Sequence, residues 1–439
     1  RFSSAYRYGV FPAGSLGIRL TELKAFSKLS WLDDLKARAG WGKTGNQLIP
    51  NVYNAYTLYA SDPANNGYDI SGSGSSVSGG FDLTQFGNPN GRWETTTSAN
   101  VGFDASMFSS KLDVVFDWYT RTTSDMLAQI AIARAQGIGT IPYTNIGTMR
   151  NRGVDLTIDW KDQAMGGKLR YSAGLTFTHY KNEVIKLNND PNATLFGFTT
   201  RIPSITATKK GYPIASFYGF WQDGLVTANN AASVPKYGSY TKEGSFNFRD
   251  VNGDGVITAA DRTILGNPHP DFIFGLNLSA GYKNWDLAVF AKGSYGGQIF
   301  NYVRYWTDFN TFQGNRSKRM LYESYGETAN PKLPKINASD GVSGAVVSSY
   351  FLEDGSYLRL SNVQLTYSIP DNIMKKVGFT GAQLYIQGQN ILTVTKYTGM
   401  DPDINIRTSQ NNNQDFHMGI DEGAYPVAKQ YLFGVRVKF

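Results

Sequence analysis

The strongest candidate for metal chemistry in the sequence is a short run of oxygen-bearing side chains. Acidic, amide and hydroxyl residues recur between Asp250 and Asp261, and Gly255 stands at the sixth of the twelve positions. This spacing matches a calcium-binding loop motif, in which alternate residues wrap one ion and the glycine allows a sharp turn. The predicted ligands are Asp250, Asn252, Asp254, Val256 (through its carbonyl oxygen), Thr258 and Asp261.

The same loop can also be explained without a metal. Its twelfth position is Asp261, where the motif usually has a bidentate Glu, and no long amphipathic helix flanks it. A turn rich in Asp and Asn can organise itself through hydrogen bonds from backbone amides to its side chains. Calcium and a metal-free turn therefore both stay open, and no other cofactor is predicted.

The remaining residues favour binding over catalysis. The three histidines, His179, His269 and His417, have no metal-ligand spacing, and no Ser, His and Asp set has a recognisable context, so an enzyme is not predicted. Aromatic rings in a long connection could stack on sugar rings, or pack against the loops themselves. The candidates for substrate binding are Tyr302, Tyr305, Trp306 and Phe309.

Alternation of apolar and polar residues shows which elements must position these residues. Leu112, Val114, Phe116 and Trp118 alternate with polar neighbours, and the same period recurs along the chain. A period of two is typical of a β-strand with two different faces. Strands are predicted at 11–20, 33–43, 93–105, 110–124, 149–161, 167–182, 271–282, 285–297, 351–367, 380–393 and 427–439.

Connection lengths indicate the kind of sheet. The connections between predicted strands alternate strictly between short and long, and the long ones are 44–92, 125–148, 183–270, 298–350 and 394–426. Outer-membrane barrels have short periplasmic turns and long extracellular loops, whereas a water-soluble sandwich has no reason to place every long loop at one end. The sequence predicts an all-β transmembrane antiparallel barrel, with apolar side chains facing lipid and polar ones lining a wet lumen.

Composition agrees with this fold class. The 439 residues include 14% aromatic and 18% charged residues and no Cys, which excludes a disulfide scaffold and a disordered chain. The 42 basic and 35 acidic residues form no block of like charge, so nucleic-acid binding is not indicated. About eleven predicted strands cannot close a barrel, because bacterial barrels have even strand numbers. We expect 1–439 to be part of a barrel of about 22 strands.

Several short motifs follow one another in fixed order along the chain. They include Arg7-Tyr8-Gly9-Val10-Phe11-Pro12, Gly45-Asn46-Gln47, Asn151-Arg152-Gly153-Val154, Gly211-Tyr212-Pro213, Glu353-Asp354-Gly355, Gln389-Asn390 and Tyr397-Thr398-Gly399. The set extends from one end of the chain to the other, which makes it far more specific than any single motif. It resembles the SusC/RagA-type TonB-dependent transporters of the outer membrane.

This resemblance implies an importer of oligosaccharides or peptides in the outer membrane of a Gram-negative bacterium. It also implies energy supplied through TonB and a SusD-like surface lipoprotein that covers the long loops. On this resemblance, we expect residues 1–439 to be the C-terminal part of such a barrel, without the plug domain and the N-terminal strands of the family. The two alternatives are a passive outer-membrane porin, which would close with these strands alone, and a secreted calcium-binding β adhesin.

Overall fold

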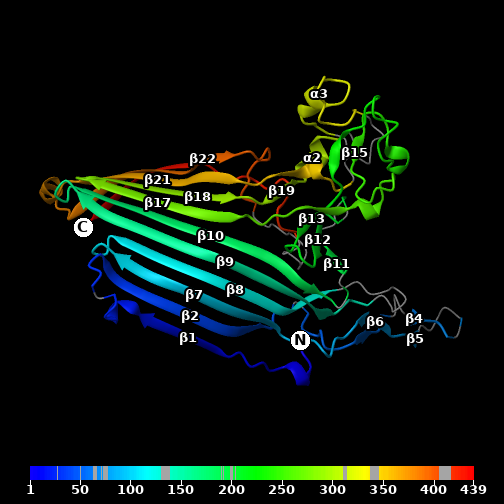
Figure 1. Cartoon of the computed structure of the whole chain (residues 1–439), viewed down its shortest axis with the longest axis horizontal. Helices are drawn as coiled ribbons and strands as arrows, with labels where there is room; N and C mark the ends of the chain where they lie inside the picture. The colour runs from blue at the N-terminus through cyan, green and yellow to red at the C-terminus, as the bar shows by residue number, and fades with distance from the viewer. Residues whose placement is uncertain are drawn as a thin grey trace.

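The computed structural model is dominated by one curved antiparallel sheet (Figure 1). The structure describes residues 1–26, 28–49, 51–62, 67–70, 72, 78–129, 139–188, 190, 192–197, 201–202, 204–309, 314–336, 346–404 and 417–439. The eleven strands of the sheet are β1 (Ala13–Arg19), β2 (Leu32–Asn46), β7 (Glu94–Met107), β8 (Leu112–Gln129), β9 (Tyr143–Ala164), β10 (Leu169–Leu187), β17 (Phe272–Tyr282), β18 (Trp285–Tyr295), β21 (Tyr357–Ile369), β22 (Gly381–Thr395) and β24 (Gln430–Lys438).

Each strand of the sheet pairs with its neighbours in chain order, and the register places apolar side chains in rows across the strands. One row contains Phe103, Phe116, Leu156, Phe177 and Phe274, which are successive partners from β7 to β17. Paired residues in an antiparallel sheet point to the same face. The predicted alternation is therefore confirmed as a single continuous apolar face.

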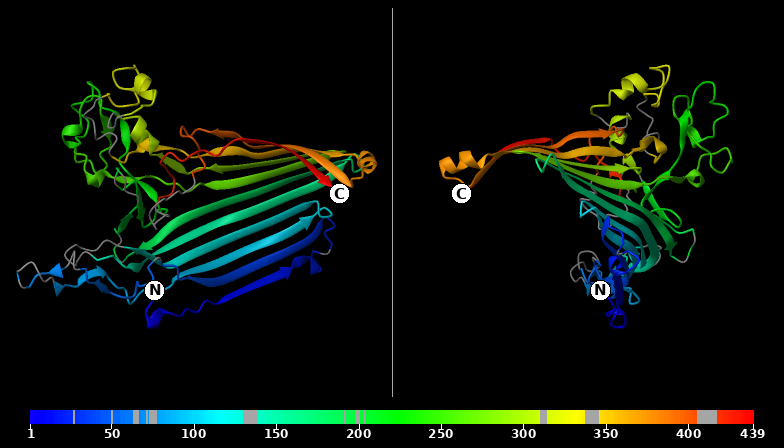
Figure 2. Two further views of the ribbon diagram at one scale, coloured as in Figure 1. Left: turned by 180° about the vertical axis from the view of Figure 1, so that it is seen from behind. Right: turned by 60° about the vertical axis from the view of Figure 1, so that its left-hand side comes forward.

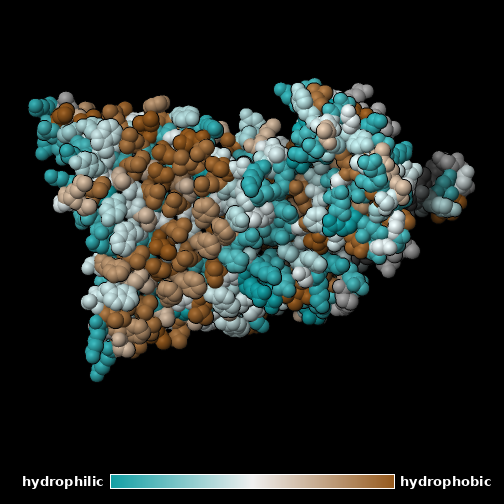
Figure 3. All heavy atoms as spheres, turned by 45° about the horizontal axis from the view of Figure 1, so that its top comes forward, coloured by the Kyte–Doolittle hydropathy of each residue, from teal (hydrophilic) through white to brown (hydrophobic). Residues whose placement is uncertain are grey.

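This apolar face lies on the outside of the curved sheet. Figure 3 shows it as a brown band across the strands, with hydrophilic residues on both sides. Trp118, Leu278, Ile386 and Val435 are among its exposed side chains. A band of apolar side chains bounded by polar margins is the surface that a membrane barrel presents to lipid.

The inner face carries ion pairs. Arg38 Nη2 lies 2.8 Å from Asp104 Oδ1 and 2.9 Å from Asp117 Oδ2, and Lys161 Nζ lies 3.2 Å from Asp113 Oδ2. These side chains alternate with the apolar rows, so they project to the opposite side of the sheet. The wall thus has the polar inner face that a water-filled lumen requires.

The long connections gather at one end of the strands, which we call the outward end (Figures 1 and 2). The opposite end carries short turns and the C-terminus. Each predicted strand corresponds to an observed one, but β8, β9 and β10 extend further at the outward end, to Gln129, from Tyr143 and to Leu187 instead of 124, 149 and 182. The prediction was also wrong at 351–356. There β20 (Leu352–Asp354) leaves the main sheet and pairs with β19 (Gln298–Asn301), and Gly355 N donates to the carbonyl oxygen of Gly297 before β21 begins.

The sheet is open in the described part of the chain. β1 stands at one edge and β24 at the other, and each pairs with a neighbour on one side only. The prediction that these strands do not close a barrel by themselves is therefore confirmed. Each backbone amide left without a hydrogen bond at an edge inside lipid costs on the order of several kcal/mol, because the bilayer core contains no water to replace the partner.

Among the residues described, no helix combines the length and the apolar composition needed to cross a bilayer.

The two faces give a direct test of the fold. Replacement of Leu156 on the apolar face by Arg (Leu156→Arg) is expected to destabilise the folded protein by about 2–4 kcal/mol, because the charge would lie near the bilayer midplane. Thr157→Arg, one residue further on and facing inward, is expected to cost less than about 1 kcal/mol. The measurement is the free energy of unfolding in lipid vesicles. Equal costs at the two positions would contradict the assignment of the faces.

Candidate site formed by the outward loops

Three long connections fold together at the outward end and form a cap beside the wall (Figure 1). The connection between β10 and β17 contains a small sheet with the order β11-β12-β13-β16 and a second pair, β14-β15. Their bounds are β11 (Thr194–Phe196), β12 (Thr206–Lys209), β13 (Ser216–Gly219), β14 (Gln222–Leu225), β15 (Phe246–Phe248) and β16 (Thr263–Gly266).

The second and third connections are joined by a three-stranded sheet. β19 pairs in antiparallel fashion with β20 and in parallel with β23 (Ile420–Asp421), which comes from the connection before the last strand. Two short helices, α2 (Val303–Thr307) and α3 (Arg319–Glu323), follow β19. Backbone hydrogen bonds therefore hold together segments more than a hundred residues apart.

The cap has a hydrophobic core of its own. Three of its residues are fully buried: Phe217 from the first connection, and Phe300 and Phe351 from the second. Ile420 from the third connection packs in the same core. The ring of Phe300 is stacked on Phe351 at 5.0 Å and tilted against Phe217 at 6.1 Å. Because one core draws on all three connections, we expect them to order as one unit.

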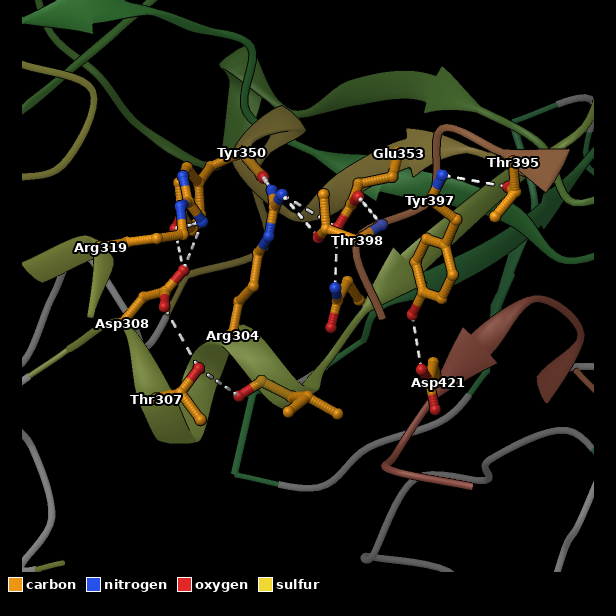
Figure 4. Close-up of polar contacts among 12 residues, drawn as sticks. Arg304, Thr307, Asp308, Arg319, Tyr350, Glu353, Thr395, Tyr397, Thr398 and Asp421 are labelled. Atoms are coloured by element: carbon orange, nitrogen blue, oxygen red, sulfur yellow. Dashed lines mark hydrogen bonds and ion pairs between the residues drawn. The ribbon is translucent and has the colours of Figure 1, made fainter. Parts of the chain in front are cut away.

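Charged side chains bridge the second and third connections around this core (Figure 4). Arg304 Nη2 lies 2.9 Å from Glu353 Oε1, and Arg304 Nη1 donates to the carbonyl oxygen of Tyr350 at 2.7 Å. The backbone amide and the hydroxyl of Thr398 both donate to Glu353 at 2.8 Å. The Glu353 carboxylate therefore fixes the third connection to the second.

Two buried phenols complete this network. The Tyr350 hydroxyl donates to Asp308, which also lies 2.7 Å from Arg319 Nη1, and the Tyr397 hydroxyl donates to Asp421. Burial, and then repulsion by the Asp308 carboxylate, raises the pKa of Tyr350 well above its usual range. Burial also raises the pKa of Tyr397, with the hydrogen bond to Asp421 adding to it. Both phenols thus remain protonated donors.

A buried arginine attaches the third connection to the wall. The Arg359 side chain is 2% exposed; it forms an ion pair with Asp401 and lies 3.3 Å from Asp403. Asp403 also lies 2.7 Å from Lys292 Nζ, and Asp401 accepts hydrogen bonds from the backbone amides of Asp403 and Val427. The two carboxylates therefore hold the loop over the inner face of β21.

The first connection is held at its base by β10. Val184 exchanges backbone hydrogen bonds with Gly211 and Tyr212, and His269 Nε2 lies 3.0 Å from the carbonyl oxygen of Ile214. Burial lowers the pKa of His269, and this hydrogen bond opposes the shift only in part. The Tyr180 hydroxyl contacts the other ring nitrogen at 3.3 Å. The imidazole is therefore neutral near pH 7, and its role is to pack between Ile214 and Tyr180.

The four aromatic candidates for substrate binding have different surroundings. Tyr302, Tyr305 and Phe309 are 3–5% exposed and pack in or against the core of the cap, so their ring faces are covered by protein. Trp306 is 36% exposed, and the guanidinium of Arg201 lies 5.3 Å from its ring centre. Stacking of a sugar ring on Trp306 stays a prediction, whereas the other three rings contribute to the stability of the cap.

The Asp250–Asp261 loop is organised by its own backbone. Asp250 accepts hydrogen bonds from the amides of Gly253 and Gly255 at 2.7 and 2.6 Å, and Asp254 Oδ1 accepts from the Val256 amide at 2.8 Å. Gly255 has φ +81°, the left-handed conformation that glycine adopts without strain. Among the described residues, no three Asp, Glu or His side chains are grouped so as to hold a metal.

Asp261 is the centre of this loop. It is fully buried and accepts backbone hydrogen bonds from Val251 at 2.9 Å and from Thr258 at 2.8 Å. Burial opposes ionisation, but hydrogen bonds from Thr258, Val251 and Asn252 outweigh it and lower the pKa of Asp261. Protein amides thus satisfy the Asp261 carboxylate, and calcium binding by the loop stays a prediction.

Removal of calcium from the full-length protein decides between the two explanations. If the loop binds the ion, a chelator is expected to expose 250–261 to protease, and Asp254→Asn, which removes one predicted carboxylate ligand, is expected to abolish the calcium dependence. Asp261→Asn is expected to destabilise the loop by about 1–3 kcal/mol with or without calcium, because it leaves a buried amide unpaired. Unchanged protection in chelator would contradict the calcium prediction.

Sequence reasoning did not identify the residues that organise the cap. Arg304, Asp308 and Tyr350 lie in segments without periodicity, and their partners are distant in sequence. One signal was present: the resemblance rests in part on Glu353-Asp354-Gly355 and Tyr397-Thr398-Gly399, and the structure brings these two motifs into contact through Glu353 and Thr398.

An open wall with an apolar outer face, a charged inner face and folded outward loops defines part of a large outer-membrane β-barrel. A family model described as TonB dependent receptor-like, beta-barrel matches residues 2–293. The chain therefore belongs to the TonB-dependent receptor-like β-barrels, which are Gram-negative outer-membrane proteins.

Curated relatives and solved structures agree with this assignment. The chain is 30% identical to TonB-dependent receptor P3 of Formosa agariphila and 28% identical to TonB-dependent receptor SusC of Bacteroides thetaiotaomicron, covering 100% of itself and 42% and 41% of those proteins. It is similar to the RagAB peptide transporter structure, with a TM-score of 0.80 and 26% identity over 100% of this chain and 44% of that one. The chain thus spans about two fifths of the relatives it matches.

Proposed function

We propose that the chain is the C-terminal part of a TonB-energised importer of oligosaccharides or peptides. The observation that carries this proposal is the folded cap: three long connections share one core at the outward end of a wall that is polar inside. A cap of this kind can hold a bulky solute above the lumen. Similarity to TonB-dependent receptor SusC supports TonB-dependent import, and similarity to the RagAB peptide transporter supports peptides as a solute.

The remainder of the barrel is proposed to come from further strands that cover the free edges of β1 and β24. Both edges are exposed along their length, and the match covers only about two fifths of the relatives. Energy from TonB would act on a plug held inside the complete barrel. A passive porin made of these strands alone is not favoured, because the described sheet is open.

A SusD-like surface lipoprotein is the proposed partner of the outward loops. The arm formed by β3 (Leu58–Ala60) and β6 (Asp82–Gln85) projects beyond the wall and carries exposed Tyr59 and Phe81. Exposed aromatic residues are frequent anchors of protein interfaces. A lipoprotein bound here would cover the cap and would bury the aromatic rings that are exposed outside the membrane band.

Uptake by whole cells tests the function. Cells that carry the full-length gene are expected to accumulate a labelled oligosaccharide or peptide mixture, and deletion of TonB or of the gene is expected to abolish the uptake. A variant with Trp306→Ala separates capture from energy coupling, since it is expected to raise the half-saturation concentration and leave the maximal rate nearly unchanged. Uptake that persists without TonB would contradict active import and support a porin.

A further inference from the structure

The margins of the lipid-facing band can be located on β9. Between Arg152 and Asp162 the lipid-facing positions are Val154, Leu156, Ile158 and Trp160, all apolar. Ten residues at about 3.3 Å each, tilted by about 40°, correspond to about 25 Å along the membrane normal, the height of the apolar band of such barrels. Arg152 therefore lies at the outward margin of the band and Asp162 at the margin near the short turns.

Charge is balanced differently at the two margins. Asp162 lies 2.8 Å from Lys111 Nζ, so the margin near the short turns is neutralised within the protein. At the outward margin Arg152 stands directly opposite Lys181 of β10 in the strand register, and both are exposed. Like charges directly opposite each other in a sheet are destabilising. An external anion at this position would remove the repulsion.

The surroundings of this basic pair leave it without an acidic partner. In the adjacent row Glu183 already forms an ion pair with Arg150, in which Glu183 Oε2 lies 3.0 Å from Arg150 Nη2. Within the part of the chain that the structure describes, neither the Arg152 guanidinium nor the Lys181 ammonium forms an ion pair or a hydrogen bond. Thr120 stands opposite Arg152 on β8, and the next row toward the membrane contains Trp118, Val154 and His179. The pair thus keeps a charge of +2 at the membrane surface.

We propose that Arg152 and Lys181 bind the phosphate of a phosphorylated glycolipid in the outer leaflet. Arginine can donate two parallel hydrogen bonds to a phosphate, and lysine adds a mobile point charge. Directly below the pair, the row of Val154 contains Trp118 and His179, and the row after it contains Leu156 and Phe177. Acyl chains would lie against the apolar side chains of these rows while the headgroup meets the cations. This continuity with the lipid-facing band favours a lipid over a soluble anion or a protein.

The test uses the full-length protein reconstituted in nanodiscs and does not depend on transport. Binding of bis-phosphorylated lipid A is compared for the unchanged protein, for Arg152→Gln/Lys181→Gln and for Lys161→Gln/Arg170→Gln. The last variant removes equal charge from the same two strands, but on the inner face. Heat-modifiable migration in gel electrophoresis verifies that each variant is folded.

We expect affinity for bis-phosphorylated lipid A to fall roughly 25-fold in Arg152→Gln/Lys181→Gln, about five-fold for each cation, and to stay within two-fold of the unchanged protein in the inner-face variant. Dephosphorylated lipid A is expected to bind all three proteins equally weakly. Equal loss in both double variants, or equal binding of phosphorylated and dephosphorylated lipid, would overturn the proposal. Full displacement of the lipid by millimolar inorganic phosphate would also overturn it, since the site would then take a free anion.

Discussion

Arg359→Ala is expected to destabilise the attachment of the third connection by about 3–5 kcal/mol. Removal of the guanidinium leaves Asp401, which is 9% exposed, without its counter-ion, whereas Asp403 keeps its ion pair with Lys292 and its hydrogen bond with Tyr357. An unpaired buried carboxylate is far more costly than the loss of the pair as a whole. The measurement is protease cleavage within 396–429 and the free energy of unfolding of the full-length protein in detergent.

Two further variants show whether the buried charge is the cause. Arg170→Ala breaks a pair whose side chains are 66% and 47% exposed, and is expected to cost less than about 1 kcal/mol because water already screens it. Arg359→Met combined with Asp401→Asn removes both charges and is expected to recover part of the loss. A double variant as unstable as Arg359→Ala would show that packing, and not the stranded charge, determines the stability.

Phe300→Ala is expected to loosen the whole cap while leaving the wall intact. The ring is fully buried and contacts Phe217 and Phe351, so truncation creates a cavity and costs about 3–5 kcal/mol. The amides of β19 and β23 are expected to lose hydrogen-exchange protection together, because the Phe300 amide donates to Gly419 and its strand pairs with Ile420. Amides of β8 and β9 are expected to keep theirs.

The matched control is Tyr322→Ala in α3. Its side chain is 70% exposed, so truncation is expected to change protection by less than about 0.5 kcal/mol. Loss of protection confined to β19, with β23 unaffected, would show that the three connections are independent and that the common core does not couple them.

Much of the wall could be predicted because the relevant signals are local. The alternation from Leu112 to Trp118 assigns each side chain to one of two faces without knowledge of any partner strand, since successive residues of a strand point to opposite sides. Connection lengths then placed the long loops at one end. The break at Gly355 was missed because the strand pattern continues through 351–356 while the pairing partner changes to β19.

The cap could not be predicted in the same way. Aromatic residues such as Tyr302 and Phe309 have the composition of a sugar-binding surface, and only their burial shows that they form a core. The ligand spacing of Asp250–Asp261 likewise describes both a calcium loop and a turn held by its own amides. Residue type and spacing specify what a side chain can do, whereas its surroundings determine what it does.

By itself the sequence determined the strands, their two faces and the end at which the long loops emerge, because a period of two is imposed by the backbone of each strand. Only the tertiary structure decided that Arg359 is neutralised by Asp401, that Thr398 is held by Glu353, and that Arg152 stands opposite Lys181. These relations join residues 29 to 45 positions apart. They depend on the path of each connection and on strand register, for which the chain carries no local period.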